Sequence, residues 1–208
     1  MLDQGTTNMS KFDISEKLES AGARLGFFNG QARVGFSGKF LSEDTNMVIN
    51  LLADQLKNPL FAEQELEKSK KRQIAGYKRS KESTRGNAMN NMLQAFYGSD
   101  HQNSPTNPDE AIEQIKELTS EDLKNYHKEK YGLGSMVLVV VGDVDHVMME
   151  NLLKESFGGW KQSSLKNKEE KNAGSKISNK VYVTMQDKTS TDFVVGTALG
   201  IDRYHPDY

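Results

Sequence analysis

Four histidines are the side chains best suited to metal chemistry in this 208-residue chain, namely His101, His127, His146 and His205. A zinc site built from histidine needs several ligands brought together, commonly two from one helix and a third group from elsewhere. Neither H-E-x-x-H nor its inversion H-x-x-E-H occurs in the sequence. The absence of cysteine excludes disulfides and thiolate ligands. The residues alone therefore predict no complete catalytic centre.

Two histidines have alternative interpretations that need no metal. His146 and Glu150 are four residues apart and would meet on a helix, where they form either an incomplete ligand pair or, as we favour, a surface polar pair. His127 lies near the end of a helix rich in Lys and Glu, where a favourable interaction with the helix dipole is the expected role. His101 and His205 fall in predicted loops with no partner nearby in the sequence.

Other charged clusters also have ordinary structural explanations. Asp143 and Asp145 follow an apolar run and could mark a carboxylate site at a strand end, but capping of the next helix is the favoured interpretation. The basic run at 68–72 is offset by Glu63, Glu65 and Glu67, which predicts a solvated helix face.

Composition limits the class of protein. The net charge of -2 arises from 27 basic and 29 acidic residues, so the chain has no electrostatic signature of nucleic-acid binding. No apolar run approaches the roughly 18 residues that span a bilayer, so no membrane span is expected. No signal peptide is visible at Met1, and the end at Tyr208 lacks a terminating motif, which suggests a fragment of a longer polypeptide.

The first half of the chain alternates helical and extended patterns. A helix is expected over 12–22 with Ser10 or Asp13 at its cap, and two short strands over 24–38 around the turn pair Asn29-Gly30. Helices are then expected from Ser42 to Asn58, over the charged residues 62–82, and over 86–97, followed by a loop over 98–108.

The second half begins with two helices, one opened by Asn107-Pro108 and one by a capping box at Thr119. The run 136–141 is continuously apolar and predicts a strand buried on both faces. A helix then ends near Gly158-Gly159. Residues 161–179 have the composition of a polar linker, and 181–185 and 193–198 indicate two further strands. The sequence thus predicts an α+β domain over 1–160, a linker over 161–179, and the first strands of a second unit over 180–208.

Several segments, taken in order, resemble the pitrilysin/insulinase family of zinc metallopeptidases, an inverzincin family that includes mitochondrial processing peptidase and bacterial zinc proteases. They are MLDQGTTNMS with ISEKLESAGARL, the segment LLADQLKNPLFAEQELEKSKKRQIAGYKRSKES, the segment LTSEDLKNYHKEKYGLGSMVLVVVGDVD, and Gly158-Gly159-Trp160. The resemblance covers nearly the whole chain. It implies an α/β sandwich, in which helices pack on an antiparallel sheet and which is duplicated within each half of a clam-shell. The domain over 1–160 would then lack its first strands, and 180–208 would begin the duplicate.

The resemblance also bears on zinc. Catalytic halves of the family carry H-x-x-E-H directly before the stretch that matches Met1–Thr6, and a third ligand, a Glu, about 76 residues beyond the second histidine. That position falls at Gly76 or Tyr77, and no acid occurs between Glu67 and Glu82. The open three-ligand site that catalytic zinc requires cannot be completed from this helix. We therefore predict no catalytic residue and no metal ligand in this chain, while its substrate-binding residues remain unidentified.

The function that the resemblance implies is that of a non-catalytic half, which encloses and helps to bind a peptide substrate together with a zinc-bearing catalytic half on the same or a separate chain. The chain alone is then expected to be inactive. Two alternatives stay open: a catalytic half truncated just after its H-x-x-E-H, and a purely structural family subunit. The strands between Gly26 and Gly35 match the region that lines the chamber, either as a peptide-binding edge or as an ordinary sheet edge. Export of bacterial relatives suggests the periplasm.

Overall fold

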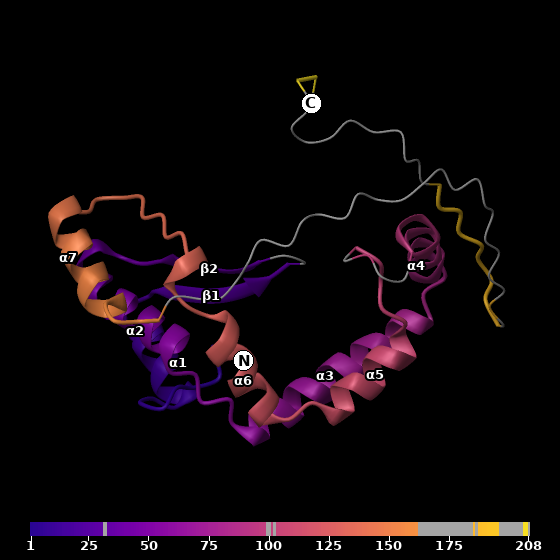
Figure 1. Ribbon diagram of the computed structural model, residues 1–208, viewed down its shortest axis with the longest axis horizontal. Coiled ribbons are helices and arrows are strands. Elements are labelled where there is room, and N and C mark those ends of the chain that lie inside the picture. The colour runs from indigo at the N-terminus through magenta and orange to yellow at the C-terminus, as the bar shows by residue number, and fades with distance from the viewer. Residues whose placement is uncertain are drawn as a thin grey trace. The chain divides into compact units, whose positions relative to one another are not determined.

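The structure is a computed structural model that describes residues 1–30, 33–98, 101, 103–161, 185, 187–195 and 206–207. Its helices and strands follow the chain in the order shown in Figure 1. Their bounds are α1 Lys11–Ser20, β1 Arg24–Asn29, β2 Val34–Lys39, η1 Ser42–Asp44, α2 Thr45–Lys57, α3 Glu63–Lys81, α4 Thr84–Tyr97, α5 Pro108–Glu117, α6 Ser120–Lys130, η2 Leu133–Ser135 and α7 His146–Phe157.

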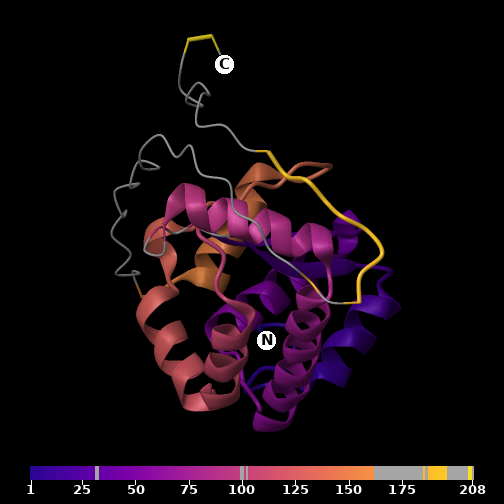
Figure 2. The ribbon, with the colours of Figure 1, turned by 90° about the vertical axis from the view of Figure 1, so that its right-hand side faces the viewer.

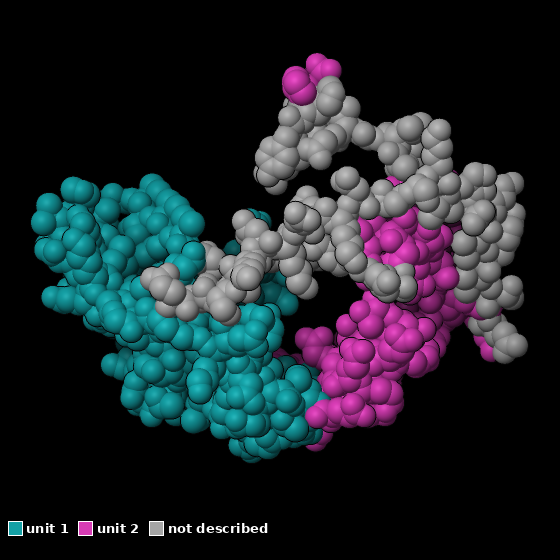
Figure 3. Space-filling view, viewed as in Figure 1, with its two compact units in different colours: residues 1–70, 118–167 teal, residues 71–117, 168–208 magenta. Residues whose placement is uncertain are grey.

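The chain divides into two compact units. Unit 1 comprises residues 1–70 and 118–167, and unit 2 comprises residues 71–117 and 168–208 (Figure 3). The predicted linker over 162–179 and the predicted strand residues 181–184 and 196–198 lie outside the described residues. The division into a domain over 1–160, a linker and a second unit stays a prediction.

Unit 1 is built on an antiparallel hairpin that lies over helix α2. β1 pairs with β2 in a register that sets Arg24 opposite Lys39 and Asn29 opposite Val34. The predicted two-residue turn at Asn29-Gly30 is wrong, because the strands end at Asn29 and Val34 and leave four residues between them. Within that connection the Gly30 amide donates to the Arg33 carbonyl at 2.8 Å. The predicted α+β arrangement of helices and an antiparallel sheet is confirmed.

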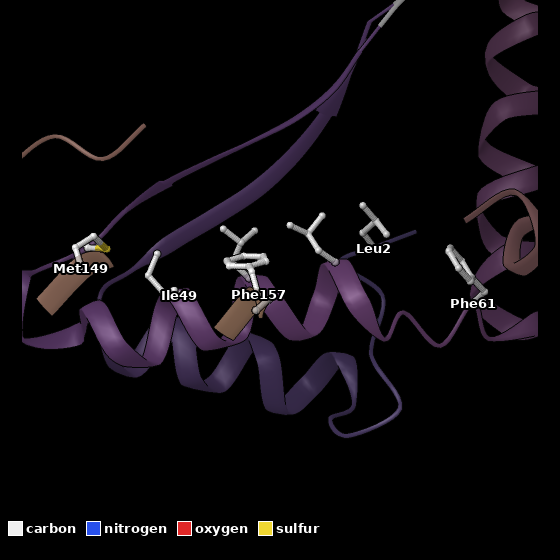
Figure 4. Packing of buried hydrophobic residues seen from close by; sticks show 8 residues of the cluster. Leu2, Ile49, Phe61, Met149 and Phe157 are labelled. Atoms are coloured by element: carbon white, nitrogen blue, oxygen red, sulfur yellow. The ribbon is translucent and has the colours of Figure 1, made fainter. Parts of the chain in front are cut away.

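The core of unit 1 lies between the hairpin, α2 and α7. Seven of the 13 residues of α2 are buried, at the spacing that places them on one side of the helix and its flanks. Figure 4 shows Ile49, Leu2 and Phe157 in the space between α2 and the hairpin. Two polar contacts join the helices: Lys57 Nζ donates to the Ser156 carbonyl at 3.0 Å, and Ser156 Oγ donates to Asn50 Oδ1 at 2.8 Å.

Local signals in the sequence account for the starts of α1, α5 and α6. The capping box at Thr119 opens α6 and Pro108 is the first residue of α5, as predicted. Of the two caps considered for α1, Ser10 is the N-cap, and Asp13 completes its capping box. Each capping side chain satisfies backbone amides that a helix start leaves without an intrahelical partner. These starts are therefore decided by residues within one turn of the boundary.

The described part of unit 2 contains the later part of α3 with α4 and α5. The end of α3 lies beside the start of α5 (Figures 1 and 2), and Lys81 Nζ is 2.7 Å from the carboxylate of Asp109. None of the residues of α4 is fully buried.

The predicted strand at 136–141 differs most from the structure. It is not assigned as a strand, and it is not buried on both faces. Met136, Leu138 and Val140 pack against the core cluster, whereas Val137, Val139 and Val141 are exposed. Because every residue of this segment is apolar, the sequence pattern does not show which face is exposed. The prediction of burial on both faces was therefore wrong.

Candidate functional site

Helix α3 contains the position where the family resemblance would place a third zinc ligand. Gly76 lies in the interior of this helix, and a β-carbon built on it would meet no atom within 4 Å. A side chain would therefore fit there, and the residue type rather than the space makes the position non-ligating. Tyr77, the alternative position, offers a phenol and not a carboxylate, and its carbonyl accepts a hydrogen bond from Ser80 Oγ at 2.7 Å.

Two acids in the first turns of α3 are held in ion pairs. Glu65 lies 2.6 Å from Lys68 Nζ and 3.7 Å from Lys11 Nζ, and Glu67 lies 2.8 Å from Lys70 Nζ. The hydrogen bond from Lys68, helped by the charges of Lys68 and Lys11, lowers the pKa of Glu65 below its ordinary 4.5. These carboxylates are satisfied by cations on or beside α3.

Glu82, just beyond α3, has a similar environment. Its Oε2 lies 2.7 Å from Lys188 Nζ, and this hydrogen bond is the main cause that lowers the pKa of the Glu82 carboxyl. Among the described residues, no group of three His, Asp or Glu side chains could hold a metal ion. The residues present in the described part of the chain thus do not fit the zinc that the family resemblance implies. That the chain binds no zinc stays a prediction.

The His146–Glu150 pair is not assembled into a ligand set. Both residues lie in α7, but Glu150 Oε1 is 2.6 Å from Lys154 Nζ. The hydrogen bond from Lys154 is the largest cause of a lowered Glu150 pKa, and the charge of His146 is a minor one. Asp145 caps α7, since its side chain accepts a hydrogen bond from the Met148 amide at 2.8 Å, which confirms the cap interpretation.

His127 has a structural role that the sequence did not reveal. Its Nε2 lies 2.8 Å from the Leu56 carbonyl, and its ring stacks on Tyr131 and meets Phe61 edge-on. Burial lowers the pKa of His127 from its ordinary 6.5, against the hydrogen bond to Leu56, which raises it. The ring links α6 to the end of α2 through the Leu56 carbonyl. His127 lies in the last turn of α6, and its predicted interaction with the helix dipole stays a prediction.

The other histidines do not extend the site. His101 Nδ1 accepts a hydrogen bond from the Asn103 amide at 3.0 Å, and its ring stacks on Tyr97 with the centroids 4.5 Å apart. His205 lies outside the described residues.

The hairpin is the described region closest to a candidate peptide-binding edge. Leu25, Phe27 and Phe36 face the core, while Phe28 lies on the other face and is about half exposed. Val34, at the end of β2, is also about half exposed, on the face that Phe36 shares. Gly35 lies opposite Phe28, and a β-carbon at Gly35 would come within 2.2 Å of the Phe28 ring. Within the described residues each strand of the hairpin has one paired neighbour, so both outer edges retain backbone groups for strand addition.

No helix that the structure describes is both long and apolar enough to cross a membrane.

Comparison with known proteins identifies relatives along the whole chain. Residues 1–110 match the family model described as insulinase (peptidase family M16), and residues 117–208 match the model of the peptidase M16 inactive domain. An uncharacterized zinc protease of Rickettsia felis is 25% identical over 169 residues, which are 80% of this chain and 40% of that protein. The cytochrome b-c1 complex subunit 1 of Bos taurus is 26% identical over 75% of this chain and 32% of its own length.

Solved structures show the same fold. The peptidase M16 inactive domain from Pseudomonas fluorescens superposes with a TM-score of 0.72 at 21% identity, covering 82% of this chain and 42% of that one. A protease from Helicobacter pylori gives a TM-score of 0.65 at 18% identity, covering 83% of this chain and 41% of that one. The chain thus spans less than half the length of these relatives.

Proposed function

We propose that this chain, which belongs to the insulinase family of peptidases (peptidase family M16), acts as the non-catalytic half of a two-part zinc peptidase. A partner half, on the same or a separate polypeptide, would supply the zinc. The present chain would close over an extended peptide and help to bind it.

The observation that carries this proposal is the chemistry of α3. Gly76 and Tyr77 stand where a carboxylate ligand is needed, and the nearest acids, Glu67 and Glu82, are held by lysines. Hydrolysis by a zinc peptidase needs three protein ligands and an open position for water. A helix without the third ligand favours a role in substrate binding over a role in the chemical step.

The hairpin supports the peptide-binding part of the proposal. An extended peptide gains affinity by donating and accepting backbone hydrogen bonds at a sheet edge. The half-exposed Phe28 would add an apolar contact beside the outer edge of β1.

The proposal is tested by metal analysis and peptide cleavage on the full 208-residue chain, alone and mixed with a catalytic half of the same family. We expect no stoichiometric zinc and no cleavage by the chain alone, and cleavage in the mixture that exceeds the catalytic half alone. One zinc per chain, retained through α3 side chains, would contradict the proposal. It would favour instead a catalytic half whose H-x-x-E-H precedes the present sequence.

A purely structural role is the second candidate, and the similarity to the cytochrome b-c1 complex subunit 1 favours it. The same mixing experiment separates the two roles. If the chain binds the catalytic half but never changes cleavage of any peptide in a diverse library, the structural role is preferred.

A further inference from the structure

Helix α3 carries a cluster of cations that no carboxylate neutralises in the part of the chain that the structure describes. No acid occurs between Glu67 and Glu82 in the sequence. The ion pairs of the helix involve Lys68, Lys70 and Lys81. The exposed cations of α3 that have no ion pair among the described residues are Lys71, Arg72, Lys78 and Arg79.

A glycine separates the two arginines of this cluster. Gly76 lies four residues after Arg72 and three residues before Arg79, in the interior of α3. Residues at these spacings are neighbours on a helix surface, with β-carbons about 5–6 Å apart. The arginines therefore flank Gly76 on one side of α3 and are separated by roughly 10 Å along the helix axis.

The space above Gly76 is open. A β-carbon built on this residue would meet no atom within 4 Å, so the packing of the chain does not require a glycine here. Glycine in a helix interior lowers helix stability relative to alanine. The close approach of a ligand to the backbone is a use of glycine that offsets this loss.

The remaining neighbours of Gly76 on the helix surface bring no negative charge. Gln73 and Ser80 are neutral, and Ser80 Oγ donates a hydrogen bond to the Tyr77 carbonyl at 2.7 Å. Glu82, the next acid in the sequence, lies 2.7 Å from Lys188 Nζ. The described residues thus leave both guanidinium groups available to an anion from outside the chain.

The two arginines are suited to bind a carboxylate. A guanidinium group stays charged at any physiological pH and forms two parallel hydrogen bonds with a carboxylate. Lys71 and Lys78 lie five residues before and two residues after Gly76, spacings that do not face it on a helix, so they add only to the local positive potential. The net charge of -2 disfavours a nucleic acid or a membrane surface, which need a larger basic area.

We propose that Arg72, Gly76 and Arg79 form a carboxylate-binding site, which selects peptides that carry an acidic side chain or a free C-terminal carboxylate. The bound carboxylate lies above Gly76 and accepts hydrogen bonds from the arginines on either side. That the ligand is a peptide rests on the proposed function of the chain, whereas the site itself is argued from α3 alone.

Fluorescence anisotropy with the full chain measures this preference without a catalytic half. The probes are short dye-labelled peptides of one sequence: one has a central Glu and an amidated C-terminus, one has Gln in its place, and one has Gln and a free C-terminal carboxylate. We expect at least one carboxylate peptide to bind about tenfold more tightly than the neutral one, and the comparison of the two identifies the source of the carboxylate.

Variants of α3 locate the preference. Arg72→Gln combined with Arg79→Gln is expected to remove it, and Gly76→Gln, which keeps both arginines and fills the space between them, should remove it as well. Lys71→Gln combined with Lys78→Gln is the matched control, because it removes two charges at the same seven-residue spacing. The control should keep the preference, and circular dichroism checks that all variants fold.

The outcomes separate this site from the peptidase role. Equal affinity for the three peptides would overturn the site and leave the proposed function standing, and binding of none of them would contradict both. A preference lost equally in the arginine and lysine variants would arise from the general positive potential, and would overturn the site. A preference that depends on the arginines, with no gain of cleavage in the mixture with a catalytic half, would support the site and contradict the peptidase role.

Discussion

Helices α2 and α3 are neighbours in the sequence but are stabilised in different ways. Seven of the 13 residues of α2 are buried, whereas Leu66 is the buried residue of the 19 in α3. α2 is fixed by contacts with the hairpin and α7, while α3 relies on helix propensity and on ion pairs such as Glu65–Lys68. The helix that would present a zinc ligand in a catalytic half is thus α3. Most of its residues can be substituted without removing a buried side chain from the core.

The largest effect is expected from a cavity in α2. Leu52→Ala removes a side chain that is buried in the core cluster and should lower the free energy of unfolding by about 2–5 kcal/mol. Ile74→Ala on α3, a partly buried position, should cost much less. Denaturant unfolding of both variants measures the difference, and equal losses would contradict the contrast between the helices.

A buried polar group in α2 gives the next largest effect. Gln55 has an exposed fraction of 1%, and its Oε1 has no hydrogen-bond partner among the described residues. Gln55→Leu removes this unsatisfied acceptor and is expected to stabilise the chain by about 1 kcal/mol. Gln64→Leu, at an exposed position of α3, should have little effect. Destabilisation by Gln55→Leu would indicate that a water molecule or another group satisfies the amide.

Helix propensity is expected to control the stability of α3. Gly76→Ala places a methyl group where no atom lies within 4 Å, and it should stabilise the chain by about 0.5–1 kcal/mol. Thermal unfolding of the variant measures this gain. A loss of stability would show that the position is covered, and would weaken the conclusion that a ligand could have been accommodated there.

The link between α6 and the end of α2 should depend on pH. Burial lowers the pKa of His127 in the folded chain below the 6.5 expected when unfolded, so the unfolded state binds more protons as the pH falls. Stability from this group is present above pH 6.5 and is lost as the pH falls through the folded pKa. His127→Gln, which keeps an amide donor for the Leu56 carbonyl, should flatten the stability curve in this window. An unchanged curve would assign the dependence to other groups.

The smallest effect is expected from the ion pairs of α3. Glu65→Gln removes the charge that faces Lys68 and Lys11 at the protein surface. Solvent and salt screen such a pair, so the unfolding midpoint should shift slightly at low salt and not measurably at high salt. A large shift that persists in high salt would mean that α3 is held by its charges more firmly than its exposure suggests.

Much of the fold could be predicted from the sequence, because short-range chemistry determines it. The starts of α1, α5 and α6 follow from Ser10, Pro108 and Thr119, each acting within one turn of its helix. The lack of a carboxylate at Gly76 could also be predicted from the sequence, because it depends on the residue type and not on the packing around it. The burial of individual side chains could not be predicted in the same way.

The sequence by itself determined the family resemblance, the starts of α5 and α6, and the absence of an acid in the middle of α3. Only the tertiary structure decided that the His127 ring contacts the Leu56 carbonyl and that the valines at 137, 139 and 141 face solvent. Local hydrogen bonds and apolar periodicity depend on residues close in the chain. The environment of the His127 ring, and the exposed side of the segment 136–141, depend on which distant parts of the chain pack against them. An apolar residue type alone does not specify those distant parts.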